Sequence, residues 1–272
     1  MAACEVAGLY VHPVKGLGGV ELSRVDIDAA GPRFDREWMV VDPEGVFVTQ
    51  REEPRMACVS ARLQEDRLEL DAPGVGRVAL ELQRGGDGIT RSVRCWHDAL
   101  DAEDAGDAAA EWITRVLGRP LRLVRTRADH ARAVPALFSP VAATTRFTDA
   151  FPLLLIGEAS LVRLEEKLGT PFEMRRFRPN VVVRGAAAHA EDSWKRIRIG
   201  EIEFDVAKAC SRCAVPTIDP ATGERGREPL ATLAGYRTRS VTHPDGTVER
   251  GVFFGVNLVH RGTGEIAVGD EV

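Results

Sequence analysis

Two cysteines three positions apart are the residues of this chain best suited to chemistry. Cys210 and Cys213 enclose Ser211 and Arg212, and an apolar, strand-like run leads into them. A guanidinium stabilises the thiolate form of a nearby cysteine, and a thiolate is a soft ligand for a transition metal. If the protein has an active site, the sequence therefore indicates these two thiols as its centre.

The Cys-x-x-Cys spacing allows four interpretations. Half a zinc site would need partners, but Cys4, Cys58 and Cys95 are isolated and no histidine pair has ligand spacing. A thioredoxin-like dithiol would open a helix, which Pro216 and the turn of residues 219–223 oppose. Two buried cysteines acting as small apolar residues are the simplest explanation of the spacing alone. A single thiolate bound to a soft metal is the fourth interpretation.

Cations beside strand-like runs suggest an anion pocket. Lys15 follows one apolar run, and Arg36 and Arg178 each precede another. Such side chains can hold a phosphate through charge-assisted hydrogen bonds, although each one taken singly is explained as well by a solvated or salt-bridged strand end. The GxxxxGK[ST] spacing is absent at Lys15, no HExxH is present, and no GxSxG surrounds Ser193. We therefore do not expect a P-loop, a zincin site or a serine-hydrolase triad.

Composition and charge narrow the class of protein. The 272 residues are 44% hydrophobic and 28% charged, which suits one large domain or two small ones. The net charge of −5 argues against broad nucleic-acid binding, which needs a basic surface. No apolar run approaches the ~20 residues of a membrane span, and the first residues do not resemble a signal peptide. We expect a cytoplasmic protein that binds neither nucleic acid nor membrane.

The apolar periodicity predicts a strand-rich α+β fold with a few helices. One helix is expected over residues 107–117, capped by Asp107 and ended by Gly118, and a second over residues 158–168. Residues 125–145 are rich in Ala, Arg and Pro without a clear period, so a linker or a long surface loop is expected there.

Short apolar runs separated by turn residues predict the strands. The turn chemistry of residues 42–45 indicates a hairpin between residues 38–41 and 46–49. This spacing of short strands is typical of barrels and sandwiches. Further strands are expected at residues 6–11, 20–27, 58–63, 67–70, 78–82, 121–124, 181–183, 197–199, 202–206, 252–259 and 266–268.

Taken together, these segments resemble one family. Their order is that of MOSC-domain proteins of the mitochondrial amidoxime-reducing component type, and it is the ordered set that is specific. The resemblance implies an N-terminal MOSC β-barrel-like domain over residues 1–125 and a MOSC β-barrel domain over residues 126–272. The segments that carry it are residues 10–16, 34–36, 48–55, 157–161, 177–180, 190–194, 210–213, 217–220 and 254–255.

The resemblance also implies a pterin-based molybdenum cofactor. Its metal would take one protein thiolate, that of Cys213, which would make Cys213 the catalytic residue. Three sites depart from the family: Gly16 replaces a frequent Ser, Ala150-Phe151 replaces a Thr-Ser pair, and Val256 replaces a Gln. Thr148 is expected to compensate for the missing hydroxyls. The cofactor-binding residues implied by the resemblance are Lys15, Arg36, Thr148, Arg178, Asn180, Ser211, Arg212 and Asn257.

The activity that the resemblance implies is reduction of N-hydroxylated substrates, namely amidoximes, N-hydroxylated bases and hydroxylamines. No flavin, haem or iron–sulfur motif is visible, so electrons would come from a separate donor protein, ferredoxin-like or cytochrome-type with its reductase. Two alternatives stay open. One is a molybdenum-cofactor carrier without turnover, and the other is a thiol redox protein that uses Cys210 and Cys213 as a dithiol.

Overall fold

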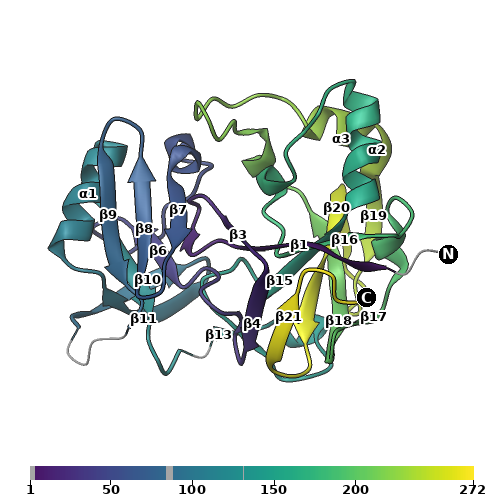
Figure 1. Cartoon of the computed structure of the whole chain (residues 1–272), viewed down its shortest axis with the longest axis horizontal. Coiled ribbons are helices and arrows are strands. Elements are labelled where there is room, and N and C mark those ends of the chain that lie inside the picture. Colours follow the sequence, from purple (N-terminus) through teal and green to yellow (C-terminus); the bar gives the residue numbers. More distant parts are fainter. Residues whose placement is uncertain (1–3, 84–87, 131) are drawn as a thin grey trace.

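The chain folds into two lobes that meet along a central seam (Figure 1). The computed structural model describes residues 4–83, 88–130 and 132–272, so most of the polar stretch at residues 84–88 lies outside the described residues. The described chain is rich in short strands and carries three α-helices. The strand-rich α+β fold expected from the sequence is confirmed.

The first lobe is built on a mixed five-stranded sheet, an antiparallel three-stranded meander and one helix. A five-stranded sheet has the order β10-β11-β12-β6-β2, and the meander β7-β8-β9 lies in the same lobe. Helix α1 (Asp107–Leu117) buries Trp112, Ile113 and Leu117 in a core that also contains Trp38. The strands are β2 (Val14–Lys15), β6 (Trp38–Val41), β7 (Ser60–Leu63), β8 (Arg67–Ala72), β9 (Gly76–Glu81), β10 (Thr90–Cys95), β11 (Asp98–Asp104) and β12 (Arg122–Thr126).

The second lobe is built on an eight-stranded sheet in the order β17-β18-β20-β15-β16-β1-β3, with β19 paired to β20. Helices α2 (Glu158–Leu168) and α3 (Leu230–Arg237) lie together on this lobe (Figure 1). Strands β15 and β16 are parallel, which helix α2 permits by crossing between them. The strands are β1 (Glu5–Val11), β3 (Val20–Leu22), β15 (Leu153–Gly157), β16 (Val181–Arg184), β17 (Arg196–Ile199), β18 (Ile202–Ser211), β19 (Thr238–Thr242) and β20 (Val248–His260).

Strands β1, β3 and β4 belong to the second lobe although they come early in the chain, while β2 between them pairs within the first lobe. Strand β1 pairs with β16, and β4 (Arg24–Asp28) pairs with both β5 (Gly31–Pro32) and β21 (Gly264–Ala267). Strand β1 and the C-terminal end of the chain both lie on this lobe in Figure 1. The division into residues 1–125 and 126–272 stays a prediction. The remaining elements are the pair β13 (Arg132–Ala133) and β14 (Thr144–Thr145) and the 3-10 helices η1 (Pro54–Cys58), η2 (Ala136–Phe138), η3 (Met174–Phe177), η4 (Ala190–Ser193) and η5 (Val215–Thr217).

The two expected helices have the expected bounds, but the first cap differs. Gly106 is the N-cap of α1, and its own N–H donates to Asp104 Oδ1 at 2.8 Å, so Asp107 lies in the first turn and does not cap. Gly118 ends the helix in the left-handed conformation that glycine adopts without steric cost, as expected.

Several strand expectations were incomplete. The expected turn at residues 42–45 is present, and residues 46–48 fold back on β6 through the Val41–Phe47 bridge and the Val48 N to Val40 O hydrogen bond of 2.9 Å, but they form isolated bridges and not a continuous second strand. The run 20–27 is divided between β3 and β4, and residues 125–145 hold the end of β12, β13, η2 and β14. Strands β10, β11, β15, β19 and helix α3 were not foreseen. Both β18 and β20 extend beyond their expected bounds, because each is paired along its length by a neighbour that the sequence does not reveal.

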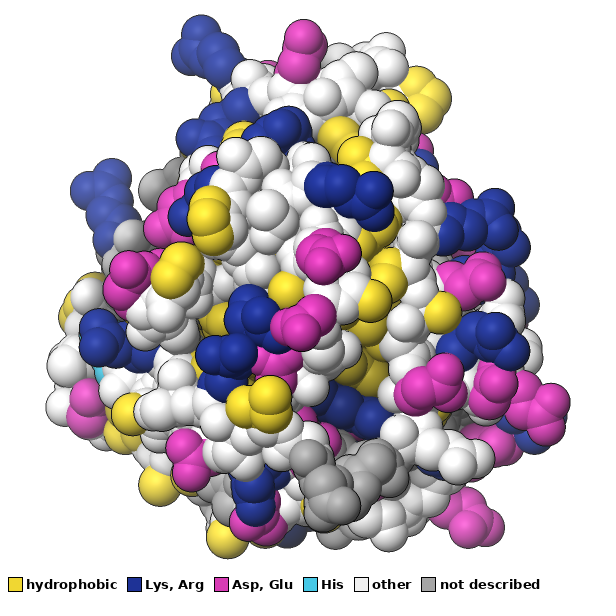
Figure 2. Space-filling model, turned by 90° about the vertical axis from the view of Figure 1, so that its left-hand side faces the viewer, with side chains coloured by type: hydrophobic (Ala, Val, Ile, Leu, Met, Phe, Trp, Pro, Cys, Tyr) yellow, Lys and Arg dark blue, Asp and Glu magenta, His cyan; other side chains and the backbone are white. Residues whose placement is uncertain are grey.

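Charges are mixed on the face of the molecule that Figure 2 shows. Basic and acidic side chains are interspersed there, with a few apolar side chains between them. Among the described residues, no helix has the length and apolar character needed to cross a bilayer.

Candidate functional site: a basic pocket between the lobes

A cavity of about 290 Å³ opens where the two lobes meet. The first lobe contributes Lys15, Gln50 and Trp96 to its lining, and the second contributes Arg178 and Cys213. Six basic side chains but a single acidic one line it, so the cavity favours an anionic ligand. The lining includes all nine residues that the sequence suggested: Lys15, Arg36, Thr148, Arg178, Asn180, Ser211, Arg212, Cys213 and Asn257.

Strand β18 brings the cysteine segment to the cavity. Its pairing with β20 shifts register between Val206 and Lys208 and again between Ala209 and Ser211. Such bulges bend a strand and redirect its side chains, which explains why consecutive residues at its end can face one cavity. Cys213 follows the strand in a loop and is exposed, while the Cys210 thiol is half-buried. The pair is therefore not a buried apolar pair, and no α-helix begins at Cys213.

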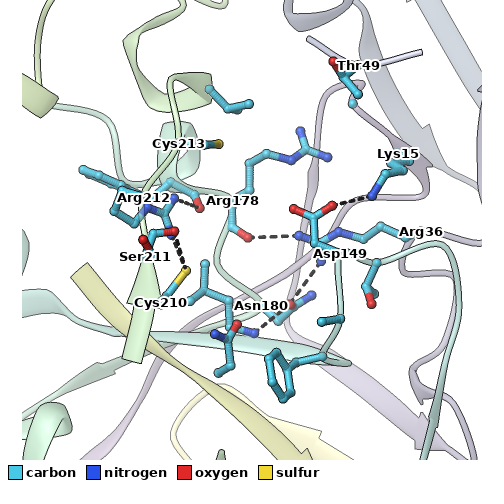
Figure 3. A pocket seen from close by; sticks show the side chains of 18 of the residues that line it. Lys15, Arg36, Thr49, Asp149, Arg178, Asn180, Cys210, Ser211, Arg212 and Cys213 are labelled. Carbon is cyan, nitrogen blue, oxygen red and sulfur yellow. Dashed lines mark hydrogen bonds and ion pairs between the residues drawn. The ribbon is translucent and has the colours of Figure 1, made fainter. Parts of the chain in front are cut away.

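The Arg212 guanidinium contacts the first cysteine of the pair. Its Nη1 donates to Cys210 Sγ at 3.0 Å, and its Nη2 donates to the Phe177 carbonyl at 2.7 Å. The planar group also lies over the Phe177 ring, 5.2 Å from the centroid. Its Nε is buried without a partner among the described residues. Arg212 thus shields Cys210, and the exposed thiol of Cys213 is left facing the cavity (Figure 3).

Arg178 is the most strongly perturbed cation of the site. It ends η3 in the left-handed conformation, with φ 59°, and extends between Cys213 and Lys15 (Figure 3). Nη1 donates to the Leu17 carbonyl, and Nη2 is buried with no described partner. Burial and the neighbouring positive charge of Arg36 lower the pKa of Arg178 to about 9. A buried cation with a free donor is a group prepared to receive an anion.

Arg36 is fixed by a small polar network. Its Nη1 donates to Asp35 and, at 3.1 Å, to Asn180 Oδ1, and its Nη2 donates to the Arg178 carbonyl at 3.2 Å. The Asn180 amide also accepts from Leu154 N and donates to Tyr10 O, each at 3.1 Å. The hydrogen bonds of the Asn180 side chain therefore go to other groups of the protein, and one of them holds Arg36 in place.

Lys15 is paired with a carboxylate that the sequence did not single out. Its Nζ donates to Asp149 Oδ1 at 2.5 Å, and Trp96 Nε1 donates to the same oxygen at 3.1 Å. Burial alone would raise the pKa of Asp149, but these contacts and the nearby charge of Lys15 hold it well below its ordinary value. Asp149 directly follows Thr148, yet no spacing marks it or Trp96 as part of a site.

The remaining predicted residues line the cavity in different ways. The buried Thr148 hydroxyl lies 2.8 Å from the Thr145 hydroxyl, so it is engaged within its own loop. Arg132 organises that loop by donating to the carbonyls of Thr148 and Asp149, at 2.6 and 3.0 Å. Asn257 lies on β20 opposite Lys208 and lines the cavity.

Backbone strain gathers at the cavity. Among the described residues, five that are not glycine have positive φ, and three of them, Arg36, Trp96 and Arg178, line it. A left-handed conformation is costly for a side-chain-bearing residue and persists only where the surrounding structure enforces it. The surrounding fold therefore holds two arginines and a tryptophan of the cavity lining in a strained backbone conformation.

Comparisons with known proteins identify the family. The model of the MOSC N-terminal beta barrel domain matches residues 3–120, and that of the MOSC domain matches residues 142–272. Mitochondrial amidoxime-reducing component 1 of Homo sapiens is 36% identical over 98% of this chain and 82% of its own length. This chain belongs to the MOSC family of the amidoxime-reducing component type.

A second amidoxime-reducing component agrees with that assignment. Mitochondrial amidoxime reducing component 2 of Bos taurus is 32% identical to this MOSC protein, over 98% of the chain and 82% of its own length. The solved YUAD protein of Bacillus subtilis aligns over 99% of this chain and 94% of its own, at 12% identity and a TM-score of 0.44. The last likeness is too weak to carry an argument.

Proposed function

We propose that this MOSC protein binds a molybdenum cofactor in the pocket between its lobes and uses it to reduce N-hydroxylated compounds. The observation that carries the proposal is the meeting of an exposed cysteine thiol with six basic side chains in one cavity. The names of the similar amidoxime-reducing components support the reaction class.

The residues present fit a phosphate-bearing, thiolate-bound cofactor. Arg178 Nη2 and Arg212 Nε are buried donors without a described partner, and both residues line the cavity. A buried, unpaired cationic donor is costly unless a ligand satisfies it. The protein would offer the metal one soft ligand, the thiolate of Cys213. Among the described residues, no group of three or more His, Cys, Asp and Glu side chains is arranged to hold a metal ion alone, so further ligands would have to belong to the cofactor.

Each wall of the cavity would have its own task. Arg178, Arg36 and Lys15 would hold the phosphate and pterin end, with Asn180 keeping Arg36 in place. Cys213 would fix the position of the metal. When bound, the cofactor would supply the two-electron redox chemistry. The protein would orient the substrate, and the surrounding side chains would limit access of water.

Electrons would come from a separate protein, ferredoxin-like or cytochrome-type with its reductase. The contact with such a donor is expected to be small and transient, about 1,200 Å² or less in total. The proposal also includes a reducing compartment such as the cytosol, because the thiolate ligand has to stay free, as all five cysteines are in this structure.

The experiment that tests the cofactor site compares two serine variants. Cys213→Ser replaces the soft ligand by a hard hydroxyl and should abolish molybdenum retention in protein made in a cofactor-producing host. Cys210→Ser is the matched control, because Cys210 lines the same cavity but is hydrogen-bonded to Arg212. It should retain most of the metal. Full molybdenum in Cys213→Ser, measured per chain, would overturn the ligand assignment.

A second measurement separates a reductase from a carrier. The loaded protein should reduce a benzamidoxime-type substrate with a reduced viologen, and should not do so with NADH alone. Turnover with NADH alone would mean that the chain holds a second redox site. Full molybdenum loading without turnover from any donor would favour a cofactor carrier.

A further inference from the structure

Three titratable side chains, His243, Glu249 and Lys208, form a hydrogen-bonded cluster at the edge of the pocket. Glu249 Oε2 accepts from Lys208 Nζ at 2.7 Å and lies 3.0 Å from His243 Nε2. Ser211 also hydrogen-bonds to this carboxylate. Of these residues, Lys208 and Ser211 line the pocket. One carboxylate oxygen therefore joins the ammonium of a pocket-lining lysine to an imidazole outside the lining.

The cluster is enclosed but keeps contact with solvent. The side chains of Lys208, Glu249 and His243 are 19%, 29% and 10% exposed. Phe138 covers them, with its ring 5.0 Å from the imidazole in an edge-on arrangement and 5.1 Å from Lys208 Nζ. Phe138 also contacts Phe151 of the pocket wall, with centroids 5.8 Å apart. Residues 136–138, expected to be part of a loop, thus form an apolar cover over this side of the site.

The charges around the cluster favour proton exchange along it. Burial alone would raise the pKa of Glu249, but the Lys208 hydrogen bond and charge lower it, so the carboxylate stays ionised between two nitrogen donors. The described charged groups that face His243 are Glu249 and Lys208 on the sheet and Asp245 in its own turn, whose carboxylate is held by Thr247. An ionised acceptor between two donors is the arrangement of a proton relay.

The reaction proposed above consumes protons inside the pocket. Converting R–NH–OH to R–NH2 breaks the N–O bond, forms an N–H bond and releases the oxygen as water. It takes up two electrons, from the separate donor protein or a reduced viologen, and two protons from solvent. A donor placed beside the leaving hydroxyl delivers such a proton faster than a chance encounter with an acid from solvent.

We propose that His243, Glu249 and Lys208 form the proton-supply chain of the pocket, with Lys208 as the group that gives a proton to the leaving hydroxyl. His243 takes a proton from solvent, and Glu249 passes it to Lys208. This inference rests on the proposed reductase function, and it adds a route that the cofactor contacts do not require.

Lys208→Met should lower kcat about 100-fold, the lower end of the range for general acid catalysis, with KM changed less than about twofold. Lys208→Arg keeps the charge and can still pair with Glu249, but a guanidinium does not release its proton, so kcat should stay low. The matched control is Lys167→Met on α2, since Lys167 also lies over an aromatic ring, that of Tyr236 at 4.8 Å, but does not line the pocket. Its kcat should be unchanged.

The rates and the solvent isotope effects of two variants test the outer residues. His243→Gln should lower kcat roughly 10-fold with KM little changed, because Glu249 then has no neighbouring imidazole to supply it with a proton. The solvent deuterium isotope effect on kcat should increase in Glu249→Gln. A rise in KM with unchanged kcat in the Lys208 variants, or full activity of Lys208→Arg, would overturn the relay in favour of substrate recognition.

One readout does not depend on activity. In the cofactor-free chain, the ¹⁵N shifts of the His243 ring should show the proton on Nε2, the nitrogen that faces Glu249. A neutral ring protonated on Nδ1 alone would break the chain of donors and sink the proposal. This measurement stays valid if the loaded protein proves inactive, so failure of the relay and failure of the reductase function can be told apart.

Discussion

Replacing Arg178 by methionine should raise the stability of the cofactor-free protein and weaken its binding of the cofactor. The lowered pKa of about 9, against an ordinary value near 12.5, corresponds to a cost of about 5 kcal/mol for keeping the guanidinium charged in the folded state. In Arg178→Met the Leu17 carbonyl loses its charged donor, which costs about 1.5–3 kcal/mol. The difference predicts that Arg178→Met stabilises the cofactor-free chain by about 2 kcal/mol, or about 4–8 °C in Tm.

The sign follows from proton linkage. A base whose pKa is lower in the folded state destabilises the fold at every pH below that value, and the penalty shrinks as pH rises from about 9 toward 12.5. The advantage of Arg178→Met over the wild type should therefore be full at pH 7 and should narrow at pH 10. The same variant should retain less molybdenum per chain, because its free Nη2 donor is lost.

The assay is thermal and urea unfolding of both proteins, made without cofactor, at pH 7 and pH 10. Arg176→Met is the matched control. Its guanidinium is two residues away, donates to the Pro216 carbonyl at 3.0 Å and lies over the Phe172 ring, outside the pocket lining. It should lose stability slightly and keep its metal. A cofactor-free Arg178→Met that melts below the wild type at pH 7 would refute the view of Arg178 as a strained, ligand-awaiting cation.

Two further predictions concern stability. Burial and the charge of Arg237 lower the pKa of His189 to about 4, so the wild type should lose about 2–3 kcal/mol of stability as pH falls from about 6.5 to 4. Asparagine tolerates the positive φ of this position, so His189→Asn should reduce this loss of unfolding free energy, as measured by urea unfolding between about pH 6.5 and 4. An unchanged loss in the variant would contradict the argument. Gly255→Ala would place Cβ 2.7 Å from both Ile156 Cγ1 and Leu155 O at φ +78°, and should cost about 2–4 kcal/mol. Gly235→Ala, whose Cβ meets nothing within 4 Å in helix α3, should be neutral or slightly stabilising in the same melt, and equal effects of the two would refute the steric argument.

The sequence predicted those elements whose limits are set locally. Helix α1 and helix α2 each combine an apolar face with a glycine that ends them in the left-handed conformation, and both bounds were correct. Strand β19 and the full length of β20 were not predictable in this way, because their residues are held by pairing partners distant in sequence. The cap of α1 was misassigned because a glycine cap leaves no side-chain signal, whereas Asp107 carries one.

The candidate site shows the same difference between features that are visible locally in the sequence and features that depend on distant residues. Motif order brought Arg36, Arg178 and Cys213 into one hypothesis, but residue patterns alone gave no reason for their convergence. Asp149 and Lys208 stayed unnoticed, because a carboxylate or ammonium in a loop or strand is ordinary until its neighbours are known. The role of Asn180 also needed the structure, since only its hydrogen bonds show that it supports Arg36.

The pairing of β1 with β16 has a consequence for how the chain is made. Val6 lies opposite Val183, so the first strand leaves the ribosome long before its partner has been synthesised. At ~5–20 residues per second, that interval is on the order of ten seconds or more, during which the strand has an open edge. The strands between residues 38 and 126 can find each other meanwhile, because their partners have been synthesised by the time residue 126 emerges. Translation would thus complete the first lobe early and leave the ligand cavity for last, closing it only when the segment that carries Arg178 and then Cys213 has emerged.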